Sequence, residues 1–242
     1  MIYLGEFERF ETEFFCRYLQ PGDVVYDVGA NIGLFSVLAA GAVGPSGRVV
    51  AFEPAARPYS RLLENVKING FDHVLCLQQG LSDQAGKLTL ASGVGADAWN
   101  SFGLGLHEGN SQFKKVSVGV GTLDAAFEED AKQGYGPPRL VKIDVEGWEG
   151  RVLAGMKRLF ASTPPEVLQV EFNDHALSAS ASSADELFRQ LNALGYEICR
   201  YCGGAELVVV DGPSGRGTQD NLFAVRNREA VLLRLVRSVE KA

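Results

Sequence analysis

The sequence predicts an α/β protein built on a doubly wound, mostly parallel sheet. Short apolar runs alternate with amphipathic helical patterns along most of the chain, which is the signature of repeated strand–helix units. The chain has 242 residues, 46% of them hydrophobic, which suffices for one large core. No internal repeat and no linker interrupts the alternation. We therefore expect a single domain over residues 1–242.

The N-terminal half shows the alternation clearly. Residues 6–19 are expected to form an amphipathic helix whose phenylalanines fall toward one side, so that residues 1–21 make up an N-terminal helical segment. Pro21-Gly22 ends this helix. Beyond it, buried strands are expected at residues 24–28, 49–52 and 74–79, and helices at residues 33–42 and 58–69.

The middle of the chain departs from the pattern. Residues 87–91 and 115–120 resemble an extra pair of strands, and residues 92–113 between them are rich in glycine and serine. A segment of that length without regular structure is usually a lid, a binding loop or a disordered stretch. We expect a substrate loop or lid at 92–113. Trp99 and Phe102 could clamp a flat or apolar ligand there, or simply pack the loop onto the domain.

The alternation resumes after this loop and continues to the end of the chain. The expected helices cover residues 123–131, 146–160, 184–194 and 228–239, and the expected strands cover residues 140–144, 167–172, 196–201, 207–211 and 221–226.

The charge and cysteine content exclude several classes of function. The chain carries 23 basic and 30 acidic residues, a net charge of −7, which argues against a partner whose phosphates must be neutralised, such as a nucleic acid. The first residues lack the pattern of a signal peptide, and no apolar run approaches the ~20 residues of a membrane span. Cys199 and Cys202 have metal-ligand spacing, but no second pair accompanies them. We expect a cytoplasmic protein; its oligomeric state is not readable from the sequence.

The first strand leads into the turn Asp27-Val-Gly-Ala-Asn-Ile-Gly33. Gly29 and Gly33 allow a tight turn, although glycines are common between any strand and helix. Asn31 stands where a dinucleotide-binding fold has a glycine, and no Lys or Arg occurs between residues 24 and 47 to meet a phosphate. The Asp27 carboxylate suits the ammonium and sulfonium groups of S-adenosylmethionine, whose own carboxylate could meet the amides of the following helix.

Two further positions suit a nucleoside. Glu53 ends the second strand 24 positions after Gly29, where a carboxylate can accept hydrogen bonds from both ribose hydroxyls. A glutamate there serves nicotinamide cofactors equally well, and it could also act only as a helix cap. Ser82 and Asp83 follow the third strand and could meet the adenine amino group, or merely form a turn.

Four segments of the chain follow one another in a recognisable order: Val25-Tyr-Asp-Val-Gly-Ala-Asn-Ile-Gly33, Phe52-Glu-Pro54, Thr122-Leu-Asp124 and Val141-Lys-Ile-Asp-Val-Glu-Gly-Trp-Glu149. Together they resemble the FkbM family of methyltransferases, in the family's order and between about residues 22 and 159. The resemblance implies a class I methyltransferase fold, with a seven-stranded sheet whose last strand is antiparallel, S-adenosylmethionine as the methyl donor, and transfer to a hydroxyl of a small molecule, natural product or glycan.

The resemblance also implies roles for individual residues. The first motif would hold the methionine portion of the cofactor, Glu53 the ribose, and Ser82 and Asp83 would lie near adenine. Lys142, Asp144 and Glu146 would lie beside the transferred methyl group. Trp148 departs from the family, which often has a small residue there. The residues implied for the methionine portion are Asp27, Gly29, Asn31 and Gly33.

The candidate catalytic residues are Lys142, Asp144 and His175. The two-residue period of a strand puts Lys142 and Asp144 on one face with Ile143 turned away. Lys142 could act as a base or position the substrate, and Asp144 could bind the cofactor or accept a proton; alternatively, the two form an ion pair. His175 follows the fifth parallel strand and could be a base near neutral pH, or only a solvated loop residue.

A divalent metal is a further possibility. Asp144, Glu171 and Asn173 offer hard oxygen ligands at adjacent strand ends, as Mg²⁺ prefers, and catechol-type methyltransferases use a similar arrangement. The ordinary alternative is that oxygen-rich strand ends are common in α/β folds.

Other functions remain open at this point. A nicotinamide-dependent oxidoreductase is disfavoured by Asn31 and by the missing second glycine. A methyltransferase acting on nitrogen or carboxyl acceptors remains possible. The acidic side chains retained at the expected strand ends argue against a catalytically silent binding domain, which a turnover assay would decide.

Overall fold

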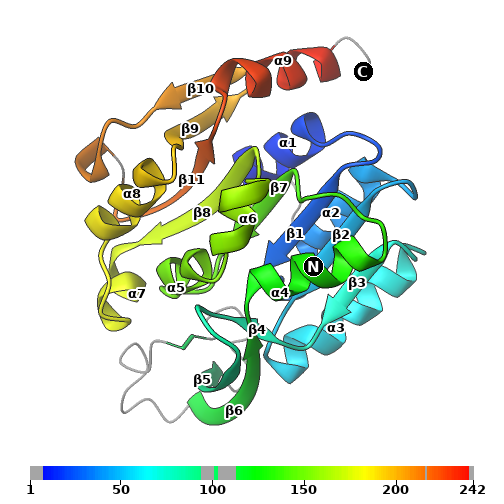
Figure 1. Ribbon diagram of the computed structural model, residues 1–242, viewed down its shortest axis with the longest axis vertical. Coiled ribbons are helices and arrows are strands. Elements are labelled where there is room, and N and C mark those ends of the chain that lie inside the picture. Colours follow the sequence, from blue (N-terminus) through cyan, green and yellow to red (C-terminus); the bar gives the residue numbers. More distant parts are fainter. Residues whose placement is uncertain (1–7, 94–100, 103–112, 216, 240–242) are drawn as a thin grey trace.

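The central sheet confirms the predicted α/β fold class (Figure 1). The computed structural model describes residues 8–93, 101–102, 113–215 and 217–239. These residues form an eight-stranded sheet in the order β10-β9-β11-β8-β7-β1-β2-β3. Strands β3, β2, β1, β7 and β8 pair in parallel, and β11 runs antiparallel to both β8 and β9. Compared with the seven strands that the family resemblance implied, the additional strand is β10, which pairs antiparallel with β9 at the sheet edge.

The strands lie close to the predicted positions because their apolar runs are buried on both faces, as expected for a parallel sheet covered by helices. All five residues of β1 and of β2 are buried. The strands are β1 (Val24–Val28), β2 (Arg48–Phe52), β3 (Val74–Leu77), β7 (Leu140–Ile143), β8 (Val167–Asn173), β9 (Glu197–Gly203), β10 (Glu206–Val209) and β11 (Gln219–Val225).

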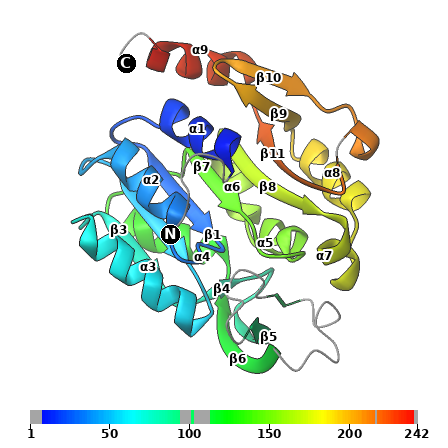
Figure 2. The ribbon, with the colours of Figure 1, turned by 180° about the vertical axis from the view of Figure 1, so that it is seen from behind.

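Helices cover both faces of the sheet, as the opposite views of Figures 1 and 2 show. One face packs against α1, α2, α3 and α9, and the other against α5, α6 and α8. In β1, Val25 faces the helices α1, α2 and α9, whereas Tyr26 faces α5, α6 and α8 on the other side of the sheet. The helices are α1 (Arg9–Tyr18), α2 (Leu34–Val43), α3 (Ala56–Ile68), α4 (Leu123–Lys132), α5 (Glu149–Ala154), α6 (Lys157–Ser162), α7 (Asp174–Ala179), α8 (Ala184–Ala193) and α9 (Arg228–Val239). No helix among the described residues combines the length and apolar character that crossing a membrane requires.

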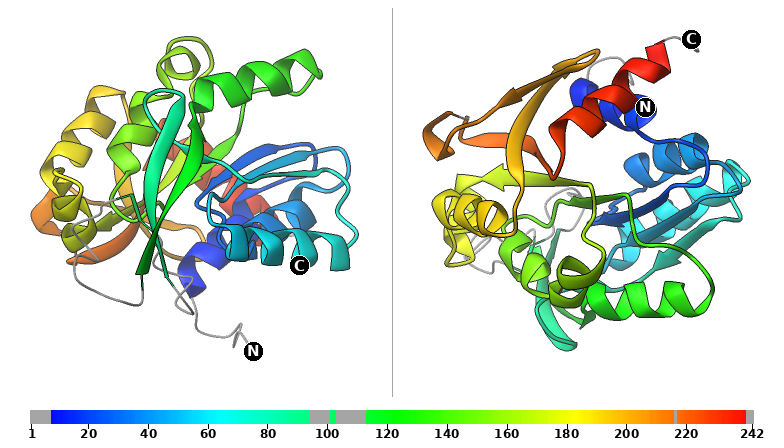
Figure 3. Two further views of the ribbon diagram at one scale, coloured as in Figure 1. Left: turned by 90° about the horizontal axis from the view of Figure 1, so that it is seen from below. Right: turned by 45° about the horizontal axis from the view of Figure 1, so that its top comes forward.

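The predicted extra strand pair is present as a separate small sheet. Strands β5 (Gly86–Gly93) and β6 (Phe113–Gly121) pair antiparallel, and the short β4 (Gly80–Leu81) pairs with β6. This ribbon crosses the lower end of the molecule (Figure 3). Most of the predicted loop at 92–113, including Trp99, lies outside the described residues; Ser101 bridges to Ala91 of β5.

The single helix predicted at 146–160 is wrong: α5 and α6 are separate, with a break at Gly155. A Cβ atom at Gly155 would lie 2.2 Å from the Ser82 carbonyl oxygen, so the chain passes too close to its neighbour for a side chain. Asp124, on α4, then caps the new helix by accepting hydrogen bonds from the Arg158 and Leu159 amides, each at 2.9 Å. The short helix α7, after β8, was not predicted.

Replacing Asp124 with alanine is expected to lower the free energy of unfolding by about 1–3 kcal/mol, because two amides at the start of α6 lose a largely buried acceptor. Urea unfolding followed by circular dichroism measures this loss. The control is Glu129→Ala on the same helix, where an exposed ion pair with Lys132 is removed and little change is expected. Equal losses in both variants would show that the two hydrogen bonds of Asp124 stabilise the fold no more than the exposed ion pair does.

Candidate functional site

A cavity of about 510 Å³ opens at the carboxyl ends of β1, β2, β7 and β8. The turn after β1 lines it, together with Glu53 after β2, Asp144 after β7 and Glu171 of β8. Leu90 of the β5–β6 ribbon closes another side. This is the edge at which ligands bind in open α/β sheets.

The glycine turn is shaped by the neighbouring strand as well as by its own backbone. Gly29 has a φ of +82°, and a Cβ atom there would lie 1.8 Å from the carbonyl oxygen of Asp144. A Cβ atom at Gly33, with a φ of +90°, would meet the Leu62 side chain of α3 at 2.6 Å. Asn31 also adopts a left-handed conformation, with a φ of 50°. The turn therefore lies against the end of β7 and the middle of α3. The Asp144 backbone excludes any side chain at Gly29, whereas at Gly33 the positive φ favours glycine more than the contact with the flexible Leu62 side chain does.

Glu53 is buried at the cavity wall. Its Oε2 atom accepts a hydrogen bond from the Asn31 amide at 2.9 Å, and its Oε1 atom accepts one from the Ala55 amide at 2.8 Å. Burial raises the pKa of the Glu53 carboxyl to about 7, against the opposing effect of the two amides. Each carboxylate oxygen can accept a further hydrogen bond. Glu53 is thus positioned to receive two hydroxyl donors from the cavity.

Asp27 is placed differently from the sequence-based expectation. Its side chain is fully buried, does not line the cavity, and accepts a hydrogen bond from the Ser36 hydroxyl at 2.5 Å. The other carboxylate oxygen lies 3.9 Å from the Lys142 ammonium. Asp27 therefore influences the cavity through Lys142 rather than by direct contact.

Lys142 is the cation at the centre of the site. Its ammonium lies 2.9 Å from Asp144 Oδ2 and 5.0 Å from the centre of the Phe35 ring, and the side chain is only 3% exposed. Burial alone would lower the pKa of Lys142, but Asp144 and Asp27 outweigh it and raise the pKa above its ordinary value. Ile143 packs on the opposite face of the sheet. Lys142 is held protonated in an ion pair, which suits a positioning role and not that of a base.

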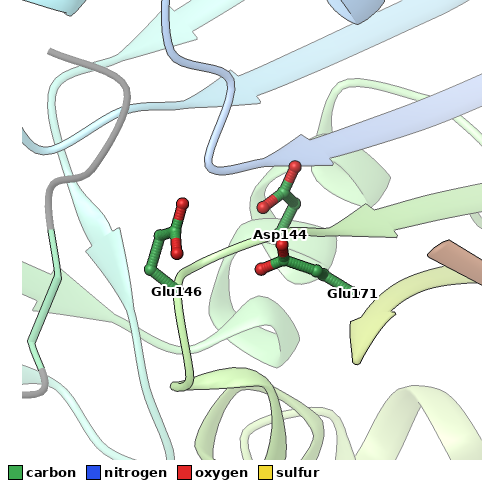
Figure 4. Close-up of side chains that lie close together, drawn as sticks. All are labelled: Asp144, Glu146 and Glu171. Atoms are coloured by element: carbon green, nitrogen blue, oxygen red, sulfur yellow. The ribbon is translucent and has the colours of Figure 1, made fainter. Parts of the chain in front are cut away.

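Three carboxylates converge beside this ion pair (Figure 4). Asp144, Glu146 and Glu171 each offer an oxygen within 4.8 Å of the others, and all three line the cavity. Burial, reinforced by the charges of neighbouring acids, raises the pKa of both Glu146 and Glu171. A set of three carboxylates can hold a hard cation. The sequence had suggested Asn173 as the third possible metal ligand, but the structure places Glu146 there. The Asn173 side-chain oxygen instead accepts a hydrogen bond from the Ala176 amide and caps α7.

Ser82 and Asp83 do not line the cavity. The Ser82 hydroxyl donates to Asp83 at 2.9 Å and accepts a hydrogen bond from the Trp148 indole at 3.2 Å. Asp83 also pairs with Arg151 at 3.2 Å. Trp148, which departs from the family pattern, and Arg151 therefore connect Ser82 and Asp83 to the start of α5. The cavity wall that follows β3 is formed instead by Gln79, Gly80 and Leu81, together with Phe102.

His175 and Glu149 also lie outside the cavity. His175 lies in the first turn of α7, is exposed to solvent, and is not among the residues lining the cavity. The N-cap at Asn173 starts the helix in an orientation that turns His175 outward, so the structure gives no support for it as a base. Glu149 is buried and accepts hydrogen bonds from the Val145 and Gly147 amides, both at 3.1 Å, which makes it part of the turn.

The sequence did not single out Glu8, Gln79 or Gln219, all of which line the cavity. Glu8 is the N-cap residue of α1. Gln219 donates a hydrogen bond to Glu171 Oε1 at 3.0 Å. Gln219 lies two residues before the strand expected at residues 221–226, and this position was the one available signal for it.

The cavity combines an acceptor for paired hydroxyls, a helix N-terminus and a cation-attracting wall. Glu53 supplies the first, the start of α2 the second, and the three carboxylates the third. A ligand that carries vicinal hydroxyls, a carboxylate and a positive charge matches all three features.

Comparison with known proteins identifies related sequences. The family model described as Methyltransferase FkbM domain matches residues 27–198. The 31-O-demethyl-FK506 methyltransferase FkbM of Streptomyces tacrolimicus is 34% identical over 199 residues, which cover 71% of this chain and 72% of that protein. The hexuronic acid methyltransferase AglP of Haloferax volcanii is 30% identical over 153 residues, 62% of this chain and 57% of that protein.

Solved structures share the fold. An rRNA methylase from Streptococcus thermophilus superposes with a TM-score of 0.50 at 13% identity, covering 93% of this chain and 98% of that chain. A protein from Clostridium thermocellum described as a putative rRNA methylase has a TM-score of 0.50 at 10% identity, over 89% of this chain and 92% of that one. At these identities the likeness is one of fold alone.

Replacing Gly29 with alanine is expected to cost about 3 kcal/mol or more of stability, because the new Cβ atom must displace the end of β7 in addition to adopting a positive φ. Gly70→Ala, after the end of α3, is the matched control: its φ is +68°, but no atom lies within 4 Å of the new Cβ. The control should lose only about 1–2 kcal/mol. Chemical denaturation of both variants measures the difference, and equal losses would mean that the contact with Asp144 is not tight.

Proposed function

The chain belongs to the FkbM family of methyltransferases, and from this premise we propose that it transfers a methyl group from S-adenosylmethionine to a hydroxyl oxygen of a small molecule or glycan. Its activity as an S-adenosylmethionine-dependent methyltransferase follows from the family; the hydroxyl acceptor is the proposal. The names of the two relatives support it, since one describes a 31-O-demethyl substrate and the other a hexuronic acid.

The observation that carries the proposal is that Glu53 and the carboxylates after β7 line the same cavity. The cofactor supplies a methyl group already activated on a positively charged sulfur. Glu53 would accept hydrogen bonds from its ribose hydroxyls. The free amides at the start of α2 would meet its carboxylate. Asp144, at the opposite wall, is available to its ammonium group.

The apolar part of the cavity suits the adenine ring. Leu81 and Phe102 provide flat, apolar contacts, and Gln79 provides an amide that can donate and accept hydrogen bonds. Gly80 lies below Phe102, where a Cβ atom would approach the ring to 2.7 Å. We propose these residues, rather than Ser82 and Asp83, as the adenine site.

Catalysis in this site would depend mainly on alignment. The chain has to hold the acceptor oxygen in line with the methyl group and accept the hydroxyl proton. Lys142 remains charged and fixes the Asp144 carboxylate through its 2.9 Å contact. Asp144 is then the residue proposed either to bind the cofactor ammonium or to take the proton.

The charge of the site favours a non-nucleic acceptor. Four carboxylates, from Glu8, Asp144, Glu146 and Glu171, line the acceptor end of the cavity, with Lys142 as the cation among them. Such a wall would repel phosphates, and the net charge of −7 adds to this repulsion. We therefore propose an acceptor without a phosphate backbone.

Cofactor affinity should depend on pH through Glu53. The carboxyl has a pKa of about 7 in the free protein, and ribose hydroxyls donate best to its ionised form. Below pH 7 the proton must first be lost, so the affinity for S-adenosylhomocysteine should fall by up to about tenfold per pH unit. Calorimetry between pH 5.5 and 7.5 measures this change, which corresponds to ~1.4 kcal/mol of binding free energy per pH unit. Glu53→Gln should bind weakly and with a shallower slope, whereas Glu64→Gln, an exposed change on α3, should follow the wild type.

The acceptor class is tested with S-adenosylmethionine carrying a deuterated methyl group and a panel of hydroxylated, aminated and carboxylated acceptors. The proposal expects products with one labelled methyl group on oxygen, located by mass spectrometry. Labelling only on nitrogen or carboxyl groups would overturn the hydroxyl assignment. Tight binding of NADH with no affinity for S-adenosylhomocysteine would instead support an oxidoreductase.

A further inference from the structure

The three carboxylates of Asp144, Glu146 and Glu171, here called the carboxylate triad, come from two adjacent strand ends. Asp144 directly follows β7, Glu146 lies two residues further in the turn, and Glu171 lies near the end of β8. Figure 4 shows the side chains gathered around a common point, and one oxygen of each lies within 4.8 Å of the others. Repulsion between carboxylates this close together is relieved either by a proton or by a bound cation.

The protein itself compensates only part of this charge. The Lys142 ammonium is engaged with Asp144 Oδ2 and also lies near Asp27. Over the residues that the structure describes, neither Glu146 nor Glu171 forms an ion pair with a lysine or an arginine. Once ionised, Glu146 and Glu171 carry two negative charges that no lysine or arginine of the described residues pairs with, which matches the charge of one divalent cation.

A separate observation points to a ligand at the same place. The Glu171 side chain belongs to a residue that is only 6% exposed, and Gln219 fixes its Oε1 atom through a 3.0 Å hydrogen bond. Its Oε2 atom is buried and has no hydrogen-bond partner in the described part of the chain. Leaving a buried carboxylate oxygen without a partner is costly. A cation between the three side chains would provide that partner.

The backbone holds Glu146 toward the triad. Glu146 has a φ of 52°, a left-handed conformation that a glutamate adopts only when its surroundings impose it. The Ser101 hydroxyl donates a hydrogen bond of 2.7 Å to the Glu146 carbonyl, and Gly147 packs against the Ala176 carbonyl, where no side chain would fit. The turn is thus braced from two sides, and the ligand set is preformed.

We propose that the carboxylate triad holds one hard divalent cation, Mg²⁺ or Mn²⁺. All three ligands are carboxylate oxygens, which favour these ions over Zn²⁺ or copper. Because the triad lines the same cavity as Glu53, the ion would lie within reach of a bound acceptor. Three protein ligands leave coordination positions open for two neighbouring oxygens of that acceptor.

This placement narrows the acceptor class, and in that respect it rests on the proposed function. An acceptor with two adjacent oxygens, such as a vicinal diol or a hydroxyl beside a carbonyl, would chelate the ion. Its hydroxyl would then be both positioned and made more acidic.

The test uses the full chain and manganese chloride as the probe, with and without S-adenosylhomocysteine. Calorimetry and Mn²⁺ electron paramagnetic resonance should both report one ion per chain, displaced by MgCl₂. Glu171→Gln and Glu146→Gln should weaken Mn²⁺ binding at least tenfold. Glu8→Gln, which removes a neighbouring charge from the same cavity but no ligand, should weaken Mn²⁺ binding much less than either triad substitution. Unaltered circular dichroism and S-adenosylhomocysteine affinity would show that the variants are folded.

Absence of Mn²⁺ binding at millimolar concentration, or binding that survives both triad substitutions, would overturn the metal site. The two proposals fail separately. If hydroxyl methylation persists in EDTA and Mn²⁺ does not bind, the metal site is wrong and the proposed function stands. If Mn²⁺ binds at the triad but no hydroxyl is methylated, the metal site stands and the acceptor assignment is wrong.

Discussion

The close contact between the turn after β1 and the end of β7 is the constraint on which the site depends. Gly29 lies so near the Asp144 carbonyl that even a methyl group would overlap it. The parallel pairing of these strands sets Asp27 opposite Lys142, so the buried Asp27 carboxylate and the Asp144 carboxylate lie 3.9 and 2.9 Å from the same ammonium. Without that proximity Lys142 would be a buried charge with one partner fewer, and burying such a charge is expensive. The sheet edge is therefore held together by packing and electrostatics at once.

The same arrangement gives the cavity its chemical character. One ammonium serves several carboxylates, so Lys142 stays charged while Glu146 and Glu171 hold their protons more tightly than exposed acids do. A wall of this kind attracts cations, whether a sulfonium, an ammonium or a metal ion, and disfavours phosphates. Glu53 adds a second polar anchor across the cavity, between apolar surfaces provided by Leu81 and Phe102. The site combines recognition of a charged nucleoside with a place for an oxygen-bearing acceptor.

The family motifs divide into residues that line this cavity and residues that build it. Glu53, Lys142, Asp144 and Glu146 belong to the first group. Asp124 belongs to the second, since it caps α6. Glu149 ties down the turn that carries Glu146, and is likewise structural. A residue of the family motifs therefore does not necessarily contact the ligand. Membership in the family identifies the reaction, whereas the geometry separates catalytic candidates from supports.

The sequence alone determined the layered fold, the glycine turn, the placement of Glu53 and the position of Lys142 and Asp144 on one face of their strand. All of these follow from local periodicity and from strand ends meeting at one edge of a parallel sheet. Tertiary structure decided the rest, because side-chain direction beyond a strand end depends on packing. It turned His175 outward on α7, engaged Ser82 and Asp83 with Trp148 and Arg151, and brought Glu8 and Gln219 into the cavity from distant parts of the chain. It also broke the helix at Gly155, where two backbone segments pass too close for any side chain.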